Sequence, residues 1–393
     1  MNHDDEINIE GSYRAYYGKL YASLLHHFGK SYIPIIENAI QNTFLKALRQ
    51  WKHGRIPENK LGWLFIVAKN DLLNQIKKEA FQINYIEFDA DQQDYRLEVL
   101  YYIIKATDIP KKAKTLFILK NIFGLHIKEI SASTLLGEEA IYKNIQRTRK
   151  RLQKGDRQKF PGSFSALKPM EITLVAEVLY GVFNIGYDAV ESKSFFNYNV
   201  CLEAYALTKT IKNQHADVRI KHLLSLFFFH IARFGSRMAK GKMISFFDQD
   251  KSLWNQSFIN AGFHYLEKPD QLNQYYIEAL IVSSYMMENN YDEGFWNKML
   301  SCYKLLQNIT DSPILQLNVC YCLMQLNQEE DAIKIIEKVE PVLRGRYYYF
   351  ELVKASLYKK NKSELSKELF LKALNNVSQP VRKQYILEHF LLE

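Results

Sequence analysis

Apolar residues recur three and four positions apart along most of the 393-residue chain, which is the spacing of one buried face of an α-helix. Only 16 Gly and 9 Pro interrupt the pattern, and 47% of the residues are hydrophobic, enough to build packed cores. We therefore predict an all-α protein. The pattern breaks over an acidic stretch at 81–95 and over KGDRQKFPGSFSALKP at 154–169. These breaks predict helical segments at 1–80, 96–158 and 170–393.

The stretch HIKEISASTLLGEEAIYKNIQRTRKRL, from His126 to Leu152, has the apolar spacing of two short helices joined by a tight turn that contains Gly137. The apolar residues that would seat them are Ile130 and Leu135 in the first helix and Ile141, Ile145 and Leu152 in the second. This spacing predicts a helix-turn-helix.

The face of the second helix that this packing leaves outward is polar and basic. Such a helix can place residues near its N-terminus on base edges in the major groove, while its later cations neutralise phosphates. A solvated basic helix is the alternative, but the turn and the apolar seat favour DNA binding. The candidate DNA-binding residues are Glu139, Tyr142, Lys143, Gln146, Arg147, Arg149 and Lys150, followed by Arg151 and Lys154.

The positive charge of the chain, +9 in total, is concentrated in its first part. Residues 1–160 hold 26 Lys and Arg against 18 Asp and Glu, whereas the remainder, with 26 against 25, is nearly neutral. Because clustered cations attract polyanions, a nucleic-acid surface is expected in the first part of the chain.

A second polar face is predicted in the segment HGRIPENKLGWLFIVAKNDLLNQIKKE, which follows IIENAIQNTFLKALRQW. Its side chains would present amides and cations to a duplex edge, because spacings of 4, 3 and 1 share one side of a helix. The residues on this face are Asn70, Asn74, Lys77 and Lys78.

Taken together, these elements resemble regions two and four of the sigma-70 family, in its small extracytoplasmic-function branch. The matching motifs are a helix ending in Gln41 and Phe44, then Trp63-Leu64 leading to Ala68-Lys69-Asn70, and Glu129-Ile130 before the recognition helix. The resemblance implies that 1–80 is region two, 81–95 an acidic linker and 96–158 region four, which would bind the minus-35 element. The chain departs from the family at Asn38 and Asn74, where relatives usually carry acidic residues.

The resemblance also assigns residues to the minus-ten element of a promoter. In the family, the loop at 52–60 captures a base that has left the stack, and the pocket must return the energy of unstacking. Core packing is the other role open to the two tryptophans, and it suits Trp63 better than Trp51. The implied minus-ten residues are Trp51, Lys52, Arg55, Trp63, Asn70, Asn74, Lys77 and Lys78.

Core RNA polymerase is the protein partner that the resemblance implies, through its beta-prime clamp and beta flap. The helix at about 36–48 would dock on the clamp. The linker acids would thread toward the RNA exit path. The implied polymerase-binding residues are Glu37, Asn38, Gln41, Phe44 and Leu45, and the linker acids are Glu87, Asp89, Asp91 and Asp94.

The last part of the chain contains an internal repeat. LNQEEDAIKIIEKV is echoed by KNKSELSKELFLKAL, with Asn327 and Asn361 separated by 34 residues, the length of a tetratricopeptide repeat. At this offset Leu323 matches Leu357, Ala332 matches Ser366 and Ile336 matches Phe370. With the stretches at 179–187, 246–255 and 312–323, this resembles a subgroup of these sigma factors with a tetratricopeptide-like extension. The residues 101–110 lack that subgroup's Cys-Cys-His-Pro stretch.

Catalytic chemistry has little support in the sequence. Asp248 and Asp250 are candidate acids, but no third carboxylate or ion loop accompanies them. Helix capping, or a salt bridge to Arg233 or Arg237, is the favoured alternative. The four cysteines lack metal-ligand spacing and are expected to be buried, free thiols. We expect no enzyme activity, no cofactor and no metal, and His222 and His230 are expected to be packed residues.

The resemblance thus implies a sigma factor that directs promoter-specific transcription initiation, with a C-terminal helical domain expected to modulate its activity and to offer a surface to a protein partner. A helix-turn-helix regulator that binds duplex DNA without polymerase is the alternative, with the repeats as a scaffold. An enzyme built on Asp248 and Asp250 ranks last. The start of the chain lacks a secretory signal and no apolar run is long enough for a membrane span, so a cytoplasmic location without membrane contact is expected.

Overall fold

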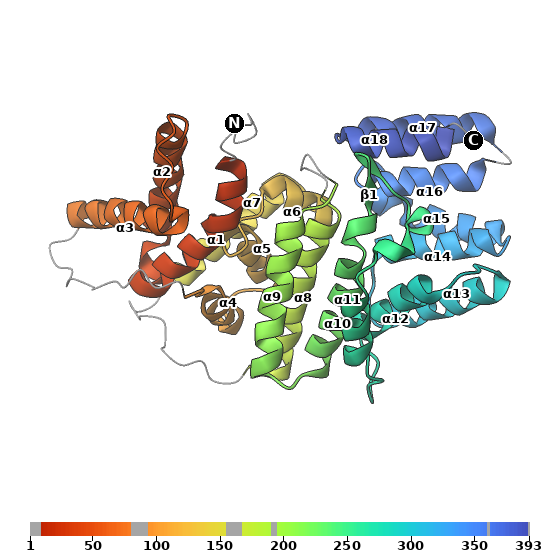
Figure 1. Cartoon of the computed structure of the whole chain (residues 1–393), viewed down its shortest axis with the longest axis horizontal. Coiled ribbons are helices and arrows are strands. Elements are labelled where there is room, and N and C mark those ends of the chain that lie inside the picture. The colour runs from red at the N-terminus through yellow and green to blue at the C-terminus, as the bar shows by residue number, and fades with distance from the viewer. Residues whose placement is uncertain (1–8, 80–92, 155–166, 190–194, 360–361, 392–393) are drawn as a thin grey trace. The chain divides into compact units, whose positions relative to one another are not determined.

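The computed structural model of the chain describes residues 9–79, 93–154, 167–189, 195–359 and 362–391 (Figure 1). Within these ranges the regular structure is helical apart from one short β-hairpin, so the prediction of an all-α protein is confirmed. The chain forms two compact units, residues 1–131 with 136–178 and residues 132–135 with 179–393.

The first unit contains two helical groups. The group that we call the N-terminal group consists of α1 (Ile9–Phe28), η1 (Lys30–Tyr32), α2 (Ile33–Trp51) and α3 (Lys60–Glu79). The second, called here the helix-turn-helix group, consists of α4 (Arg96–Lys105), α5 (Lys111–Asn121), α6 (Ile127–Thr134) and α7 (Glu138–Gln153), although the last residues of α6, 132–134, are grouped with the second unit. The first unit ends inside α8 (Pro169–Tyr187), beyond the predicted break at 154–169.

Helix α1 packs against the helix-turn-helix group through α4 and α5. The approach is closest at Gly18, where an added Cβ would lie 1.9 Å from the backbone oxygen of Ile122, so only glycine fits. Beside this point the rings of Tyr17 and Tyr21 stack, and Tyr21 meets the edge of Phe117. All three rings are almost fully buried, so the two groups share one core.

The second unit continues the helical pattern from the end of α8 to the end of the described chain. Its elements are α9 (Tyr198–Gln214), α10 (Val218–Ala232), η2 (Phe234–Ser236), β1 (Met238–Ala239), β2 (Lys242–Met243), η3 (Phe246–Asp248), η4 (Lys251–Leu253), α11 (Gln256–Tyr265), α12 (Gln274–Met287), α13 (Glu293–Gln307), α14 (Pro313–Gln325), α15 (Glu329–Leu343), α16 (Tyr348–Tyr358), α17 (Ser363–Asn376), α18 (Pro380–Ile386) and η5 (Leu387–Leu391). Each helix from α12 to α17 contacts the next, and Figure 1 shows them stacked in chain order.

The 34-residue repeat corresponds to two successive helical pairs, α14 with α15 and α16 with α17. The residues that the repeat matched occupy equivalent buried positions in the two pairs: Leu323 and Leu357, Ala332 and Ser366, Ile336 and Phe370 are each at most 5% exposed. Asn327 lies in the turn between α14 and α15 with a positive φ of 55°, which asparagine tolerates better than most residues. Its counterpart Asn361 lies outside the described residues.

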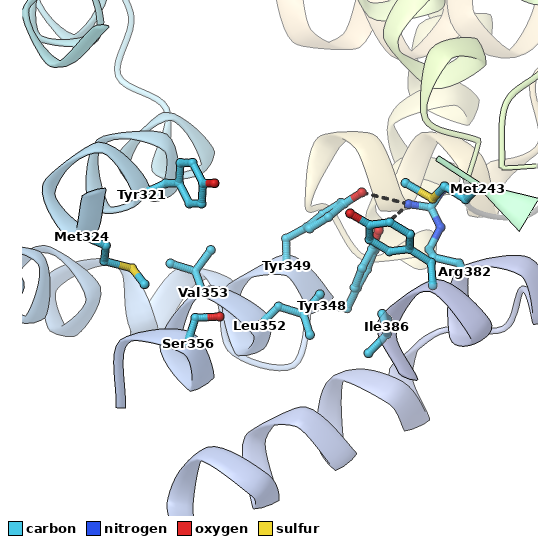
Figure 2. A pocket seen from close by; sticks show the side chains of 11 residues that line it. Met243, Tyr321, Met324, Tyr348, Tyr349, Leu352, Val353, Ser356, Arg382 and Ile386 are labelled. Carbon is cyan, nitrogen blue, oxygen red and sulfur yellow. Dashed lines mark hydrogen bonds between the residues drawn. The ribbon is translucent and has the colours of Figure 1, made fainter. Parts of the chain in front are cut away.

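At the C-terminal end of this unit, Arg382 of α18 is only 1% exposed. Figure 2 shows its side chain beside those of Tyr348 and Tyr349. Its guanidinium group pairs with Asp188 at 2.7 Å and donates hydrogen bonds to the hydroxyls of Tyr348 and Tyr349. Nε also donates to Gln379 at 2.9 Å. The charge of this buried arginine is therefore neutralised by an ion pair, as buried charges generally require.

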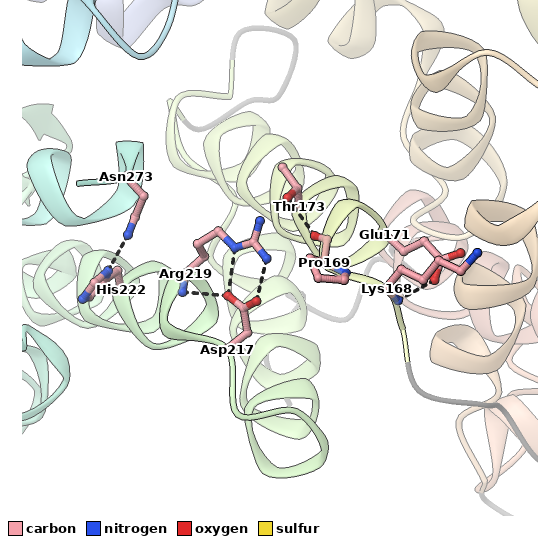
Figure 3. A network of polar contacts seen from close by, with 8 residues as sticks. All are labelled: Lys168, Pro169, Glu171, Thr173, Asp217, Arg219, His222 and Asn273. Carbon is pink, nitrogen blue, oxygen red and sulfur yellow. Dashed lines mark hydrogen bonds and ion pairs between the residues drawn. The ribbon is translucent and has the colours of Figure 1, made fainter. Parts of the chain in front are cut away.

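The start of α10 shows how polar side chains organise the second unit (Figure 3). Asp217 caps the helix, accepting from the backbone N–H of Arg219 at 2.9 Å and pairing with its guanidinium at 2.6 Å. One turn later, His222 is fully buried and bonds to Asn273 at 2.9 Å and to the backbone oxygen of Glu267 at 2.8 Å. The prediction that His222 is a packed residue is confirmed.

Candidate nucleic-acid interface

Helices α6 and α7 are separated by a three-residue turn, 135–137, where the sequence predicted one. Leu135 lies in this turn with φ of 57°, so it does not belong to the first helix, where it was expected. Gly137 is the residue before α7 and has an ordinary φ of −64°. The predicted seat is otherwise correct: Ile130, Ile141, Ile145 and Leu152 are each at most 5% exposed.

The outward face of α7 carries most of the candidate minus-35 residues. The Tyr142 ring is 56% exposed. Glu139 and Lys143, one helical turn apart, form an ion pair of 2.5 Å. The charge of Lys143 is thus partly balanced by an acid on the same exposed face. Five of the seven candidates are exposed, namely Glu139, Tyr142, Lys143, Arg147 and Lys150, while Gln146 and Arg149 are partly buried.

Arg149 does not point to solvent with the other cations of α7. It forms an ion pair with Glu37 of α2, a candidate polymerase-binding residue that is only 8% exposed. Burial raises the pKa of the Glu37 carboxyl, and the charge of Arg149 and its hydrogen bond act in the opposite direction. The sequence assigned these two residues to different partners, whereas the structure brings them together.

The two tryptophans of the minus-ten set lie side by side, with ring centroids 5.8 Å apart. Trp51 is fully buried and its Nε1 has no hydrogen-bond partner within the described chain, whereas Trp63 is partly exposed. The expected order of burial is thus reversed, because Trp51 ends α2 on the face that packs against α3. Lys52 and Arg55, in the loop that follows, are exposed.

Helix α3 exposes Asn70 and Asn74, as the spacing predicted. The side chains of Lys77 and Lys78, assigned to the same face, lie outside the described residues. Next to this face, Asp71 accepts hydrogen bonds from Asn42 at 2.9 Å and from Gln75 at 2.8 Å. The bond from Asn42 ties α3 to α2, and neither Asn70 nor Asn74 takes part in these two bonds.

The candidate polymerase-binding residues do not share one face of α2. Asn38 and Gln41 are exposed, and the Leu45 side chain is 54% exposed although it is apolar. Phe44 and Glu37 are buried, Phe44 with its ring 4.9 Å from that of Tyr13. Of the five candidates, only Asn38, Gln41 and Leu45 are therefore exposed to a partner in this arrangement.

Of the four linker acids, Glu87, Asp89 and Asp91 lie outside the described residues. Asp94 is described, and it pairs with Arg96 at 2.7 Å at the start of α4. Burial of Asp94 raises its pKa, but the hydrogen bond and charge of Arg96 outweigh it, and the pKa is lowered overall. Asp94 thus has a structural partner rather than a free carboxylate.

A second ion pair joins the two groups of the first unit, and the sequence analysis did not identify it. Arg14 of α1 pairs with Glu129 of α6 at 2.5 Å, and Glu129 also accepts the backbone N–H of His126 at 2.7 Å. The position of Glu129 three residues after His126 is a capping pattern, so its role at the start of α6 could have been predicted. Arg14 gave no such signal.

In the second unit the candidate acids do not form a catalytic pair. Asp250 caps η4 by accepting from the backbone N–H of Ser252 at 2.9 Å, as the capping alternative predicted. Asp248 lies 3.9 Å from His389, and no ion pair joins either acid to Arg233 or Arg237 in the described structure. Nor do the described residues gather three or more potential metal ligands.

The cysteines behave as the sequence predicted. All four are buried and free, and burial raises the pKa of Cys201, Cys320 and Cys322 to about 12. Thiols with such a pKa are poor nucleophiles at neutral pH. His230 packs between aromatic rings, its centroid 4.4 Å from that of Tyr187, and is a packed residue as expected.

Residues 171–269 match a family of unknown function, DUF6596. Over 94% of its length the chain is 22% identical to an uncharacterized protein of Rhizobium meliloti (strain 1021), of which the match covers 93%. No solved structure matches.

A search of the described helices for a long, apolar segment that could cross a lipid bilayer found none.

Proposed function

We propose that this protein is a sigma factor of the extracytoplasmic-function type, which binds core RNA polymerase and directs it to two-element promoters. The single observation that carries the proposal is the exposed face of α7, where Tyr142, Arg147 and Lys150 stand on a helix whose opposite face is seated by Ile141 and Ile145. A helix presented in this way can enter a major groove without losing its packing.

The N-terminal group supports the same proposal. It offers the amides of Asn70 and Asn74 on α3 and the cations Lys52 and Arg55 in the loop before α3, all exposed. Amides and cations on a helix and its adjoining loop suit contacts to base edges and phosphates. Two separate DNA-facing surfaces on one unit fit a protein that reads two promoter elements.

The extension contributes a second part to the proposal: the helical second unit modulates promoter recognition and offers a docking surface to a protein partner. Stacked helical pairs such as α14–α15 and α16–α17 generally present extended surfaces for other proteins. Asp250 caps η4 and Asp248 lies 3.9 Å from His389, so the two acids lend no support to a catalytic role for this unit.

The proposal is tested by reconstitution of the full chain with core polymerase, followed by genome-wide mapping of transcript starts. We expect a stable complex and starts that share two sequence elements. Replacing Arg147 and Lys150 together with alanine should weaken promoter binding by about tenfold or more, and the exposed Lys338→Ala on α15 serves as the matched control.

Two results would contradict the proposal. Folded protein that does not bind folded core polymerase would exclude a sigma factor. Tight and specific binding to duplex DNA in the absence of polymerase would instead favour the alternative, a helix-turn-helix regulator with a scaffold domain.

A further inference from the structure

Arg233, at the end of α10, is a buried cation without an acidic partner. The residue is only 6% exposed. Its Nε donates a hydrogen bond to the side-chain oxygen of the neutral Gln249 at 3.1 Å. The guanidinium lies 4.1 Å from the centroid of the Phe246 ring. No carboxylate of the described chain is within ion-pair distance of it. Burial of a charge without an opposite charge is unfavourable, and Arg233 has only a neutral amide and an aromatic ring as partners here.

A second unpaired cation lies in the same region. Arg237 is 7% exposed, and its guanidinium packs on the ring of Tyr187 at 3.8 Å and on Phe195 at 4.8 Å. Its Nη1 is buried and has no hydrogen-bond partner within the described chain. Each arginine disfavours the charged form of His230, which burial already keeps neutral by lowering its pKa well below the usual value. Positive charge therefore accumulates here.

Elsewhere in the second unit a buried arginine is treated differently. Arg382 pairs with Asp188 at 2.7 Å, so its charge is neutralised by a residue of the chain itself. Figure 2 shows the two tyrosine hydroxyls that accept its hydrogen bonds. Arg382 and Arg233 each line a cavity of the second unit. In one cavity the anion is part of the protein, and in the other it is absent from the described residues.

The cavity beside Arg233 has a volume of about 250 Å³. Four elements contribute to it, namely η3, α12, α13 and α14, and its walls combine aromatic rings with hydroxyl groups and one amide. The residues that define its chemistry are Phe246, Phe247, Tyr285, Tyr303, Asn318 and Tyr321. Apolar and aromatic walls with a few convergent polar groups are typical of small-molecule sites.

We propose that this cavity binds a small anionic molecule, whose carboxylate or phosphate pairs with Arg233 and whose flat apolar body lies against the aromatic walls. The planar guanidinium suits such a group because it can donate two parallel hydrogen bonds to it. Tyrosine hydroxyls and the Asn318 amide supply further polar contacts at the walls. The inference stands apart from the proposed function, because binding is measured on the protein alone.

The test uses the full chain and calorimetric titration with four probes: benzoate, phenyl phosphate, benzamide and benzyl alcohol. We expect at least one of the two anions to bind, about tenfold or more tightly than the neutral probes of similar shape. The ratio of affinities for benzoate and phenyl phosphate distinguishes a carboxylate ligand from a phosphate ligand. Equal affinity for anionic and neutral probes, or no binding of either anion at millimolar concentration, would overturn the proposal.

Three variants locate the site. Arg233→Met removes the cation, and Asn318→Trp fills the cavity from an exposed position on α14 and keeps the arginine in the sequence. The affinity of both variants for the anions should fall by about tenfold or more. Lys298→Ala, which removes an exposed cation on α13, should bind them as the wild type does. Circular dichroism establishes that each variant is folded. If Arg233→Met does not fold, Asn318→Trp decides, and full binding by it would overturn the proposal.

Discussion

Arg149 of α7 and Glu37 of α2 form a largely buried ion pair between the two helical groups of the first unit. Arg149 belongs to the proposed DNA-binding face and Glu37 to the proposed polymerase-binding set. While the pair is intact, neither side chain can reach an external partner. The ion pair therefore keeps both side chains from DNA and polymerase while the two groups are packed together. Breaking the pair should favour binding to these partners.

The first prediction concerns the strength of this pair. Removing one partner leaves the other charge buried without compensation, so Glu37→Met or Arg149→Met alone should lower the free energy of unfolding by about 2 kcal/mol. The double variant should cost less than the two single changes added together, because it leaves no unpaired charge. Urea unfolding followed by circular dichroism measures all four proteins. Strict additivity would show that the pair contributes no coupling energy.

The second prediction follows for DNA. Glu37→Met frees a cation on the DNA-binding face, so affinity for promoter duplex should rise and the salt dependence should steepen by about one counterion. Fluorescence anisotropy at several salt concentrations measures both. Glu337→Gln is the matched control, because it removes an equal negative charge from an exposed position of α15, outside both proposed DNA-binding surfaces. If both variants change affinity equally, the effect is one of net charge alone.

The third prediction concerns Gly18, which permits the close approach of α1 to the end of α5. Gly18→Ala would place a methyl group against the backbone oxygen of Ile122, which cannot rotate away, so we expect a loss of about 2 kcal/mol in stability. Gly181→Ala on α8 is the control. A Cβ there meets no atom within 4 Å, so the better helix propensity of alanine should make this change neutral or stabilising. Equal effects of the two substitutions would contradict this account of the packing.

Local periodicity predicted much of the fold. The spacing of Ile141 and Ile145 identified the buried face of α7, and the same spacing left Tyr142 exposed. The repeat offset paired Leu323 with Leu357 in equivalent helices. These successes share a cause, because a helix places residues three and four apart on one side whatever the rest of the chain does.

Long-range packing could not be predicted in this way. Nothing near Arg149 in the sequence indicates that Glu37 will meet it, since only the contact of the two groups brings them together. The prediction that Trp63 is more buried than Trp51 was wrong for a similar reason. The burial of the two rings depends on which end of α2 covers α3. The hairpin of β1 and β2 was missed although its turn, Lys240-Gly241, has positive φ at both residues, which glycine favours.

The last prediction concerns Glu278 of α12, a buried carboxyl that receives hydrogen bonds from Tyr180 and, at 2.8 Å, from Gln274. Burial raises its pKa from 4.5 to about 7, despite the opposing effect of the two hydrogen bonds. The folded protein therefore holds this proton more tightly than the unfolded chain. Stability from this group is full below pH 4.5, decreases as pH rises through the window to about 7, and is constant above it.

Glu278→Gln tests this directly, because glutamine keeps the shape of the protonated acid and cannot ionise. The wild-type free energy of unfolding should fall by at most about 3 kcal/mol across the window, and that contribution should be missing from the variant. Glu337→Gln, at an exposed position of α15, should leave the wild-type pH dependence unchanged. Urea unfolding at a series of pH values measures all three proteins. Identical pH profiles for Glu278→Gln and the wild type would show that the carboxyl titrates in the folded protein as it does in the unfolded chain.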